Sequence, residues 1–149
     1  MNNDPILILQ MQRMGDLVLS FPLLESLRRL FPLNPLIVMG EKSFYEPLQS
    51  IAPHAEYLDF RNDAAMLTGK FHAVINLSHR KEAAAIAGRV QCDTIIGPRL
   101  DAEGRLFIHG DWQLYRTSLT LNNHYHLFHW TDLNCLDIIP GQLMAQYKW

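Results

Sequence analysis

The sequence predicts an α/β fold: a Rossmann-like doubly wound parallel sheet with helices on both faces. Up to Pro98, short apolar runs recur without alternating polar residues, which is typical of strands buried on both faces of a parallel sheet. The segments between them carry apolar residues at helical spacing, so strands and helices alternate and right-handed crossovers are expected. With 149 residues, the chain has the length of one ordinary domain.

Five segments are predicted to be strands of this sheet. Each is short, rich in aliphatic residues and bounded by proline, glycine or polar residues. The first run is almost wholly apolar, so we expect it to be central. The five strands are Ile6–Gln10, Leu36–Met39, Glu56–Phe60, Ala73–Leu77 and Thr94–Ile96, the last ended by Gly97-Pro98.

The first helix is predicted to begin at Asp16, after a loop at Met11–Gly15. Apolar residues then recur every third position as far as Leu30, and Pro32 ends the helix. Pro22 lies in its first two turns, where a missing N–H costs least. The other predicted helices are Glu41–Ile51, a short one in Asn62–Thr68, Arg80–Val90, Trp112–Leu121 and His126–Ile138. A polar loop over Arg99–Asp111, with a short strand at Leu106–Ile108, is predicted before the last two.

The composition excludes several classes of protein. Hydrophobic residues make up 48% and charged residues 19%, which is globular, and the net charge of -2 argues against a nucleic-acid binder. The two cysteines, Cys92 and Cys135, form no CxxC pair and no secretory signal is visible, so buried free thiols in a reducing cytoplasm are expected. No apolar run is long enough to cross a bilayer, which predicts a soluble or peripheral protein.

Two loops are expected to meet a ligand, because ligands of doubly wound sheets bind beyond the carboxyl ends of the strands. The first is Met11–Asp16, in which Gly15 permits close backbone approach and Asp16 stands at a helix start. An N-cap role explains Asp16 without any ligand, and from sequence spacing alone it is the favoured interpretation. No glycine-rich phosphate loop occurs in the sequence, so no nucleotide site is visible.

The second loop, Ser78–Lys81, contains three side chains able to carry positive charge. His79, Arg80 and Lys81 suit an anionic ligand, but an N-cap Ser78 followed by solvated basic residues is an equal alternative. Arg13 of the first loop has the same two interpretations, as a ligand of phosphate or carboxylate or as a solvated arginine.

Histidines and aromatic residues near the end of the chain invite two further hypotheses. His124, His126 and His129 are spaced loosely like metal ligands, but no cysteine or carboxylate completes a zinc pattern, and we expect no metal. The aromatic residues are expected to pack in a core or a domain interface, and an exposed aromatic end favours dimers. These residues are Trp112, Tyr115, Tyr125, Phe128 and Trp130.

Three stretches resemble the lipopolysaccharide heptosyltransferases, which are inverting glycosyltransferases of family 9 with the GT-B fold. The first is ILILQMQRMGDLVLSFPLLESLRR, with Gly15-Asp16 and Pro22 as its core, and the second is FHAVINLSHRKEAAAIAGRVQCDTIIG. The third, HLFHWTDLNCLDI, resembles the helix that closes the N-terminal half. Gln10, Gln12 and Arg13 depart from the family pattern, which has a basic residue and then small or hydroxyl residues at these places.

The resemblance implies that Asp16 is the catalytic base and that Arg13, Met14, Gly15, Ser78, His79 and Arg80 bind substrate. It implies ADP-heptose as donor, a lipopolysaccharide core acceptor, no cofactor or metal, and a cytoplasmic location with weak peripheral contact at the inner membrane. Family members are roughly twice as long, so residues 1–141 are interpreted as the acceptor-side domain and 142–149 as the start of a linker. The donor-binding domain is expected to be absent and the chain alone inactive.

A second hypothesis needs no resemblance. The chain then is a non-catalytic Rossmann-like module that binds a ligand or a protein partner.

Overall fold

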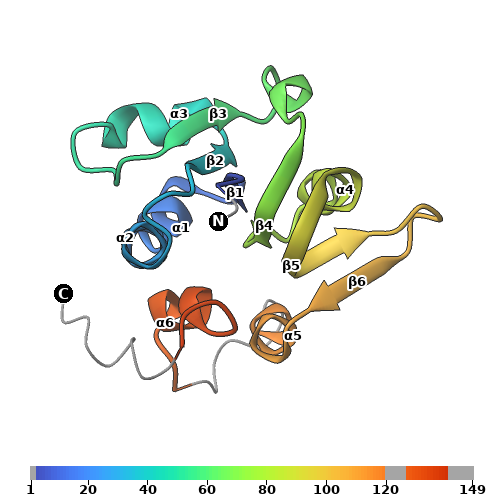
Figure 1. Ribbon diagram of the computed structural model, residues 1–149. Helices are drawn as coiled ribbons and strands as arrows, with labels where there is room; N and C mark the ends of the chain where they lie inside the picture. Colours follow the sequence, from blue (N-terminus) through green and yellow to red (C-terminus); the bar gives the residue numbers. More distant parts are fainter. Residues whose placement is uncertain (1–2, 120–126, 141–149) are drawn as a thin grey trace.

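The computed structural model describes residues 3–119 and 127–140 of the chain. Its strands form one sheet in the order β3-β2-β1-β4-β5-β6 (Figure 1), parallel throughout except for the antiparallel pair of β5 and β6. The predicted α/β fold class is confirmed. The strands are β1 (Ile6–Leu9), β2 (Leu36–Gly40), β3 (Glu56–Asp59), β4 (Lys70–Asn76), β5 (Gln91–Leu100) and β6 (Leu106–His109).

Helices cover both faces of the sheet, as expected for a doubly wound fold. Alternate residues of β1 enter two separate cores: Ile6 and Ile8 pack with α2, whereas Leu7 and Leu9 pack with α4. The helices are α1 (Met14–Val18), α2 (Phe21–Leu30), α3 (Lys42–Tyr45), α4 (Lys81–Arg89), α5 (Asp111–Ser118) and α6 (Trp130–Cys135), with 3-10 turns η1 (Glu46–Leu48) and η2 (Ala64–Met66).

The single helix predicted from Asp16 is wrong, because two helices occupy this segment. The break follows from Pro22, which has no N–H for the carbonyl of Val18 and whose ring would clash with it. Contacts from outside the helix stabilise the break. Asn134 of α6 donates to the Leu19 carbonyl at 3.0 Å, and the Ser20 hydroxyl donates to the Leu17 carbonyl at 2.6 Å.

Gly97-Pro98 does not end the fifth strand, contrary to expectation. β5 pairs with β4 as far as Ile96 and with β6 from Gly97 onward. Gly97 has φ +94°, and a Cβ there would lie 2.1 Å from the Asn76 carbonyl oxygen, so this strand turns against β4 where only glycine fits. The β5–β6 hairpin consequently extends away from the rest of the sheet (Figure 1).

Smaller differences concern the ends of elements. The helix predicted over Glu41–Ile51 is only α3 followed by η1, in which Pro47 occupies the first turn. Ser78 is not an N-cap, because α4 begins three residues later with Arg80 as its N-cap. The last predicted helix contracts to α6, and His126 lies outside the described residues, as do the residues of the predicted domain end from 141 onward.

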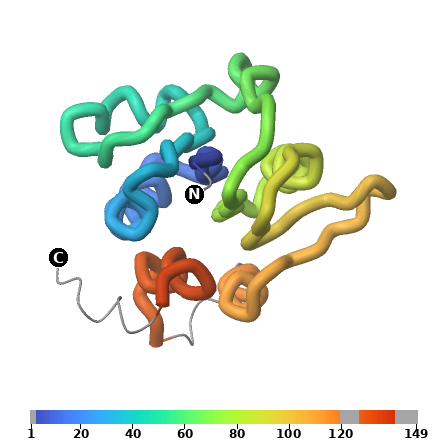
Figure 2. Tube along the Cα trace, viewed as in Figure 1, coloured from blue at the N-terminus to red at the C-terminus, as the bar shows by residue number. Residues whose placement is uncertain are grey.

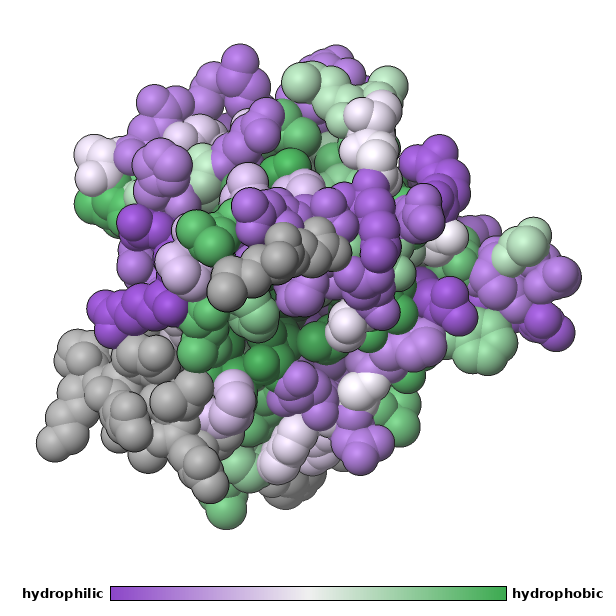
Figure 3. Space-filling view, in the orientation of Figure 1, coloured by the Kyte–Doolittle hydropathy of each residue, from purple (hydrophilic) through white to green (hydrophobic). Residues whose placement is uncertain are grey.

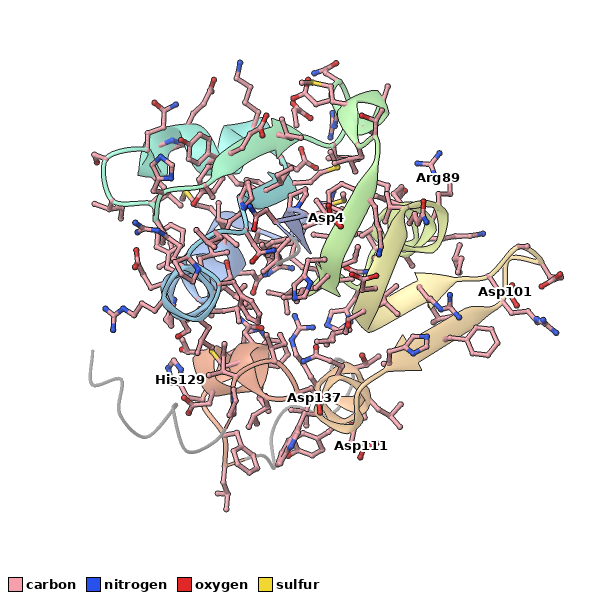
Figure 4. The ribbon with its side chains drawn as sticks, viewed as in Figure 1. Asp4, Arg89, Asp101, Asp111, His129 and Asp137 are labelled. Carbon is pink, nitrogen blue, oxygen red and sulfur yellow. The ribbon has the colours of Figure 1, made fainter. Side chains whose placement is uncertain are left out.

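α5 and α6 lie side by side at one end of the molecule (Figure 2). Asp137, which follows α6, accepts from the Gln113 backbone N–H in the first turn of α5 at 3.0 Å, and Figure 4 places Asp137 close to Asp111. Gln113 in turn donates to the Leu136 carbonyl at 3.2 Å. The two helices therefore satisfy each other's open backbone groups.

No helix among the described residues is both long and apolar enough to cross a bilayer. Both cysteines are free thiols, of which Cys135 is buried as expected and Cys92 is half-buried. Burial raises the pKa of the Cys135 thiol to about 12, so that this side chain is an uncharged part of the core.

Candidate functional site

The two loops singled out from the sequence meet at one edge of the sheet. β1 and β4 are parallel neighbours paired through Leu9 and Asn76, and the chain continues from these residues into the two loops. β1 is also where the strand order reverses, since β2 and β3 lie on one side of it and β4 and β5 on the other. Ligands of doubly wound sheets bind beyond the carboxyl ends of strands at such a switch point.

Asp16 lies inside the first turn of α1 and is not its cap. The N-cap is Arg13, whose backbone is extended, and no side chain caps the helix. The N-cap interpretation of Asp16 is therefore wrong. A carboxylate in the first turn is still favoured by the helix dipole. The buried Gln10 anchors this helix, because its Nε2 donates to the Asp16 backbone oxygen at 3.3 Å.

A hollow of about 410 Å³ opens beside Asp16. It brings together four of the residues predicted from the two loops, since Arg13, Asp16, His79 and Arg80 all line it. Its other lining residues are Gln12, Leu119 and Trp130. One carboxylate, two arginines and an imidazole thus line the same space. Leu119 and Trp130, from late in the chain, add an apolar wall.

The remaining predicted site residues do not line this hollow. Met14 and Gly15 are exposed at the start of α1, where a Cβ on Gly15 would meet nothing within 4 Å. Ser78 is buried, and its hydroxyl accepts from the Arg80 backbone N–H at 3.2 Å. Ser78 thus shapes the loop that carries His79 and Arg80.

Arg80 is held in place by several contacts. Its Nη1 lies 2.7 Å from a carboxylate oxygen of Glu41, and its Nη2 donates to the Gln12 carbonyl at 3.3 Å. Arg61 reaches the same carboxylate at 3.2 Å, and these partners, Arg80 first, lower the pKa of Glu41 although burial opposes them. Much of the charge of Arg80 is therefore compensated, whereas Arg13 remains exposed.

Arg116 of α5 is a cation that the sequence did not reveal; it does not line the hollow but lies behind Trp130, which does. Its side chain is only 1% exposed, its Nη2 donates to the Leu77 carbonyl, and its Cζ lies 5.1 Å from the centre of the Trp130 ring. Nε and Nη1 have no hydrogen-bond partner among the described residues. Burial lowers the pKa of Arg116 to about 10, opposed by the Asp16 carboxylate, so the group is charged at neutral pH.

One signal in the sequence could have revealed this arginine. α5 buries the polar Gln113 and Arg116, three residues apart, and exposes 57% of Leu114. A helix whose polar residues share the inward face is reversed relative to an ordinary amphipathic helix. Such reversal indicates a buried polar network or a ligand site.

His79 is neutral at physiological pH. Burial, and to a smaller extent the charge of Arg116, lowers its pKa to about 4. Its Nε2 is buried without a hydrogen-bond partner among the described residues. His79 can therefore accept or donate one hydrogen bond at the site but adds no charge to it.

No group of metal-binding side chains is found in residues 3–119 and 127–140. Of the three histidines considered for a metal, His124 and His126 lie outside the described residues. His129 is the N-cap of α6, where its Nδ1 accepts from the Thr131 backbone N–H at 3.2 Å. That contact gives His129 a structural role.

Three of the aromatic residues expected at an interface pack against one another. Trp112 lies edge to face with Tyr115 and with Phe128, with ring centres 5.9 Å and 5.1 Å apart. Phe128 is still 41% exposed and Leu127 is 99% exposed. Trp130 instead lies under Arg116 and lines the hollow.

The structure thus shows a Rossmann-like domain with a hollow lined by polar residues at the switch point of its sheet. No family model matches the sequence, and no curated protein is significantly similar to it. The structure is similar to the crystal structure of the glycosyl transferase family 9 from Veillonella parvula DSM 2008, with a TM-score of 0.55 and 19% sequence identity. The likeness covers 70% of this chain and 34% of that chain.

At this low identity the likeness establishes the fold alone. The chain spans about a third of the length of its structural neighbour. It therefore corresponds to one Rossmann-like part of a longer glycosyltransferase structure.

Proposed function

We propose that this chain is the acceptor-binding half of an inverting, metal-independent glycosyltransferase of the heptosyltransferase type, with Asp16 as its general base. The observation that supports this best is the position of Asp16 at the hollow beyond the switch point, which Arg13 also lines, with the buried Arg116 near enough to interact electrostatically with Asp16. The fold of the family 9 glycosyltransferase and the quoted sequence stretches favour the same function.

The proposed reaction is a direct displacement. The Asp16 carboxylate takes the proton of an acceptor hydroxyl while that oxygen bonds to the anomeric carbon of the donor sugar. The bond from this carbon to the nucleotide diphosphate breaks on the opposite side, so the anomeric configuration inverts. The electron pair leaves with the diphosphate, whose charge would be stabilised by cationic groups and helix N-termini.

The proposed substrates are ADP-heptose and the inner core of lipopolysaccharide. An anionic acceptor suits the cations around the hollow, because Arg13 and Arg116 are not paired with a carboxylate at hydrogen-bond distance within the described residues. Donor contacts are assigned to a second domain. We accordingly expect the 149-residue chain alone to bind acceptor without transferring sugar, at most weakly attached to a membrane surface.

The test measures ADP release from ADP-heptose by the protein of the full reading frame. Asp16→Asn removes the base with little change in shape and should lower the rate by about 10²–10⁴-fold. Asp111→Asn is a matched control, because Asp111 also lies in the first turn of a helix but outside the hollow. An Asp16→Asn enzyme that turns over like the control would overturn the proposed base.

A second candidate function is anion binding without catalysis. The buried Arg116, with two N–H-bearing nitrogens lacking partners among the described residues, favours it. Titration with inorganic phosphate separates the two functions. If phosphate saturates the site while the full-length protein never turns over ADP-heptose or another nucleotide sugar, the binding module is the better description.

A further inference from the structure

A second pocket lies on the other side of α1 from the hollow beside Asp16. It is formed where β1, β2 and β3 end, and it is closed by α3 and η1. Its volume is about 210 Å³. Leu17 lines this pocket, whereas its neighbour Asp16 lines the hollow. The proposed function makes no use of this pocket.

A buried hydrogen-bond acceptor in this pocket lacks a partner among the described residues. Gln10 lines the pocket and is only 2% exposed. Its Nε2 donates to the Asp16 backbone oxygen, but its Oε1 has no hydrogen-bond partner among the described residues. A buried polar atom without a partner costs about 1–3 kcal/mol, so a hydrogen bond donated to Gln10 Oε1 would be stabilising.

The charge of the lining selects the kind of ligand. Four carboxylates (Glu41, Glu46, Asp59, Asp63) and one ammonium (Lys42) line the pocket. Glu41 is ion-paired with two arginines and Glu46 with Lys42, while Asp59 accepts from Arg61 and Asn62, so the lining has more carboxylates than cations and its one cation is already paired. Such a lining repels phosphate and carboxylate and accepts hydrogen bonds from hydroxyl or amino groups.

An aromatic wall completes the pocket. The rings of Tyr45 and Tyr57 are stacked with their centres 3.9 Å apart, and both residues line the pocket. The Tyr57 hydroxyl donates to the Pro53 carbonyl at 2.9 Å, which fixes its ring. The volume is below the roughly 300–1,000 Å³ of sites for larger ligands and well above the roughly 30 Å³ of one water.

We infer that this pocket is a subsite for a single sugar ring without negative charge, whose hydroxyl or amino group donates to Gln10 Oε1. The inference extends the proposed function, because a glycosyltransferase acceptor domain would hold a second sugar of the acceptor next to the reacting one. It does not rest on Asp16 as a base. The subsite would persist if Asp16→Asn left activity unchanged, so the two proposals can fail separately.

The experiment is an NMR titration of the 149-residue chain with D-mannose, D-glucosamine and D-glucuronate, rings of similar size that differ in charge. We expect mannose and glucosamine to give saturable shifts at the amides of Gly40 and Leu58. Glucuronate should bind at least about fivefold more weakly, the factor that corresponds to roughly 1 kcal/mol. The inference is overturned if no neutral or amino sugar saturates, or if glucuronate binds equally well.

Substitution of Gln10, which carries the hydrogen-bond acceptor, gives the second arm of the experiment. Gln10→Met keeps the length of the side chain and removes its oxygen, and it should weaken mannose binding by about fivefold, as for one neutral hydrogen bond. Gln91→Met, at the exposed start of β5, is the matched control. Unchanged affinity in a folded Gln10→Met variant contradicts the assignment.

Asp63→Asn covers the case in which Gln10→Met does not fold. It keeps an oxygen for the Asp59 backbone N–H, now accepted at 2.8 Å, and removes one charge from the lining. We expect glucosamine to lose more affinity than mannose. If Asp63→Asn leaves the affinities for both sugars unchanged, the proposed lining is contradicted.

Discussion

Replacing His79 should remove a pH dependence of the unfolding free energy that arises because its imidazole is buried. The imidazole is largely buried next to the charge of Arg116, and its Nε2 has no partner in the described part of the chain. Its pKa is lowered to about 4, whereas an unfolded histidine titrates near 6.5. Protonation is therefore easier in the unfolded chain than in the folded one.

The sign and size of the effect follow from this difference. The folded pKa is the lower one, so the contribution is fully present above about pH 6.5 and is lost as the pH falls toward 4. A difference of this size corresponds to roughly 3 kcal/mol. Because water reaches part of the ring, we expect about 2 kcal/mol in practice.

Urea unfolding at about pH 7.5, 5 and 4 measures the effect as the change in unfolding free energy. His79→Gln should lose about 2 kcal/mol less than the parent over this interval. His54→Gln, which alters an exposed histidine, should follow the parent. Parallel pH profiles for His79→Gln and the parent would refute the argument that burial holds His79 neutral.

Three further predictions concern other parts of the molecule. Gly97→Ala should destabilise the fold by more than about 2 kcal/mol in urea unfolding, because it adds a clash with the Asn76 carbonyl to a positive φ. The control Gly104→Ala has φ +76° but open space around it and should cost about 1 kcal/mol. Arg116→Met should change the unfolding free energy by less than about 1 kcal/mol, since relief of the buried charge offsets the lost hydrogen bond, yet calorimetry should show phosphate binding lost. Leu127→Ser should weaken any concentration-dependent dimerisation seen by light scattering, and a parent that stays monomeric at high concentration would contradict an interface there.

The strands and the edge of the sheet that carries the hollow could be predicted from the sequence. Apolar runs such as Ile6–Leu9 are decisive because a strand buried on both faces is composed mainly of apolar residues. Once β1 and β4 were recognised as parallel strands, the loops that follow them had to meet at one edge. Arg13, Asp16, His79 and Arg80 were found in this way.

The ends and breaks of elements depend on contacts between distant residues. Apolar spacing continues across Leu19 and Ser20, so the sequence suggests one helix, whereas Asn134 caps the Leu19 carbonyl from more than a hundred positions away. The sequence predicts a strand end at Gly97, because glycine often ends strands. Its actual role is to let β5 pass the Asn76 carbonyl, which requires knowledge of the neighbouring strand.

Arg116 was missed for a related reason. An arginine on a short helix is usually solvated, and its burial here results from α5 packing against α6 and the end of β4. The hydropathy of the surface gives no additional sign of the buried Arg116. On the face shown in Figure 3, hydrophobic residues gather across the middle, with polar residues around them.

The division of the first helix affects how fast the region around Asp16 opens. α1 has five residues and buries only Leu17, whereas α2 has ten and buries Leu23, Leu24, Ser26 and Leu27. Local opening of α1 should thus cost less free energy, and its amide hydrogens should exchange with deuterium sooner than those of α2. Brief fraying of α1 would let the Asp16 carboxylate change its position, at the cost of the Leu17 contacts, while the core contacts of α2 remain.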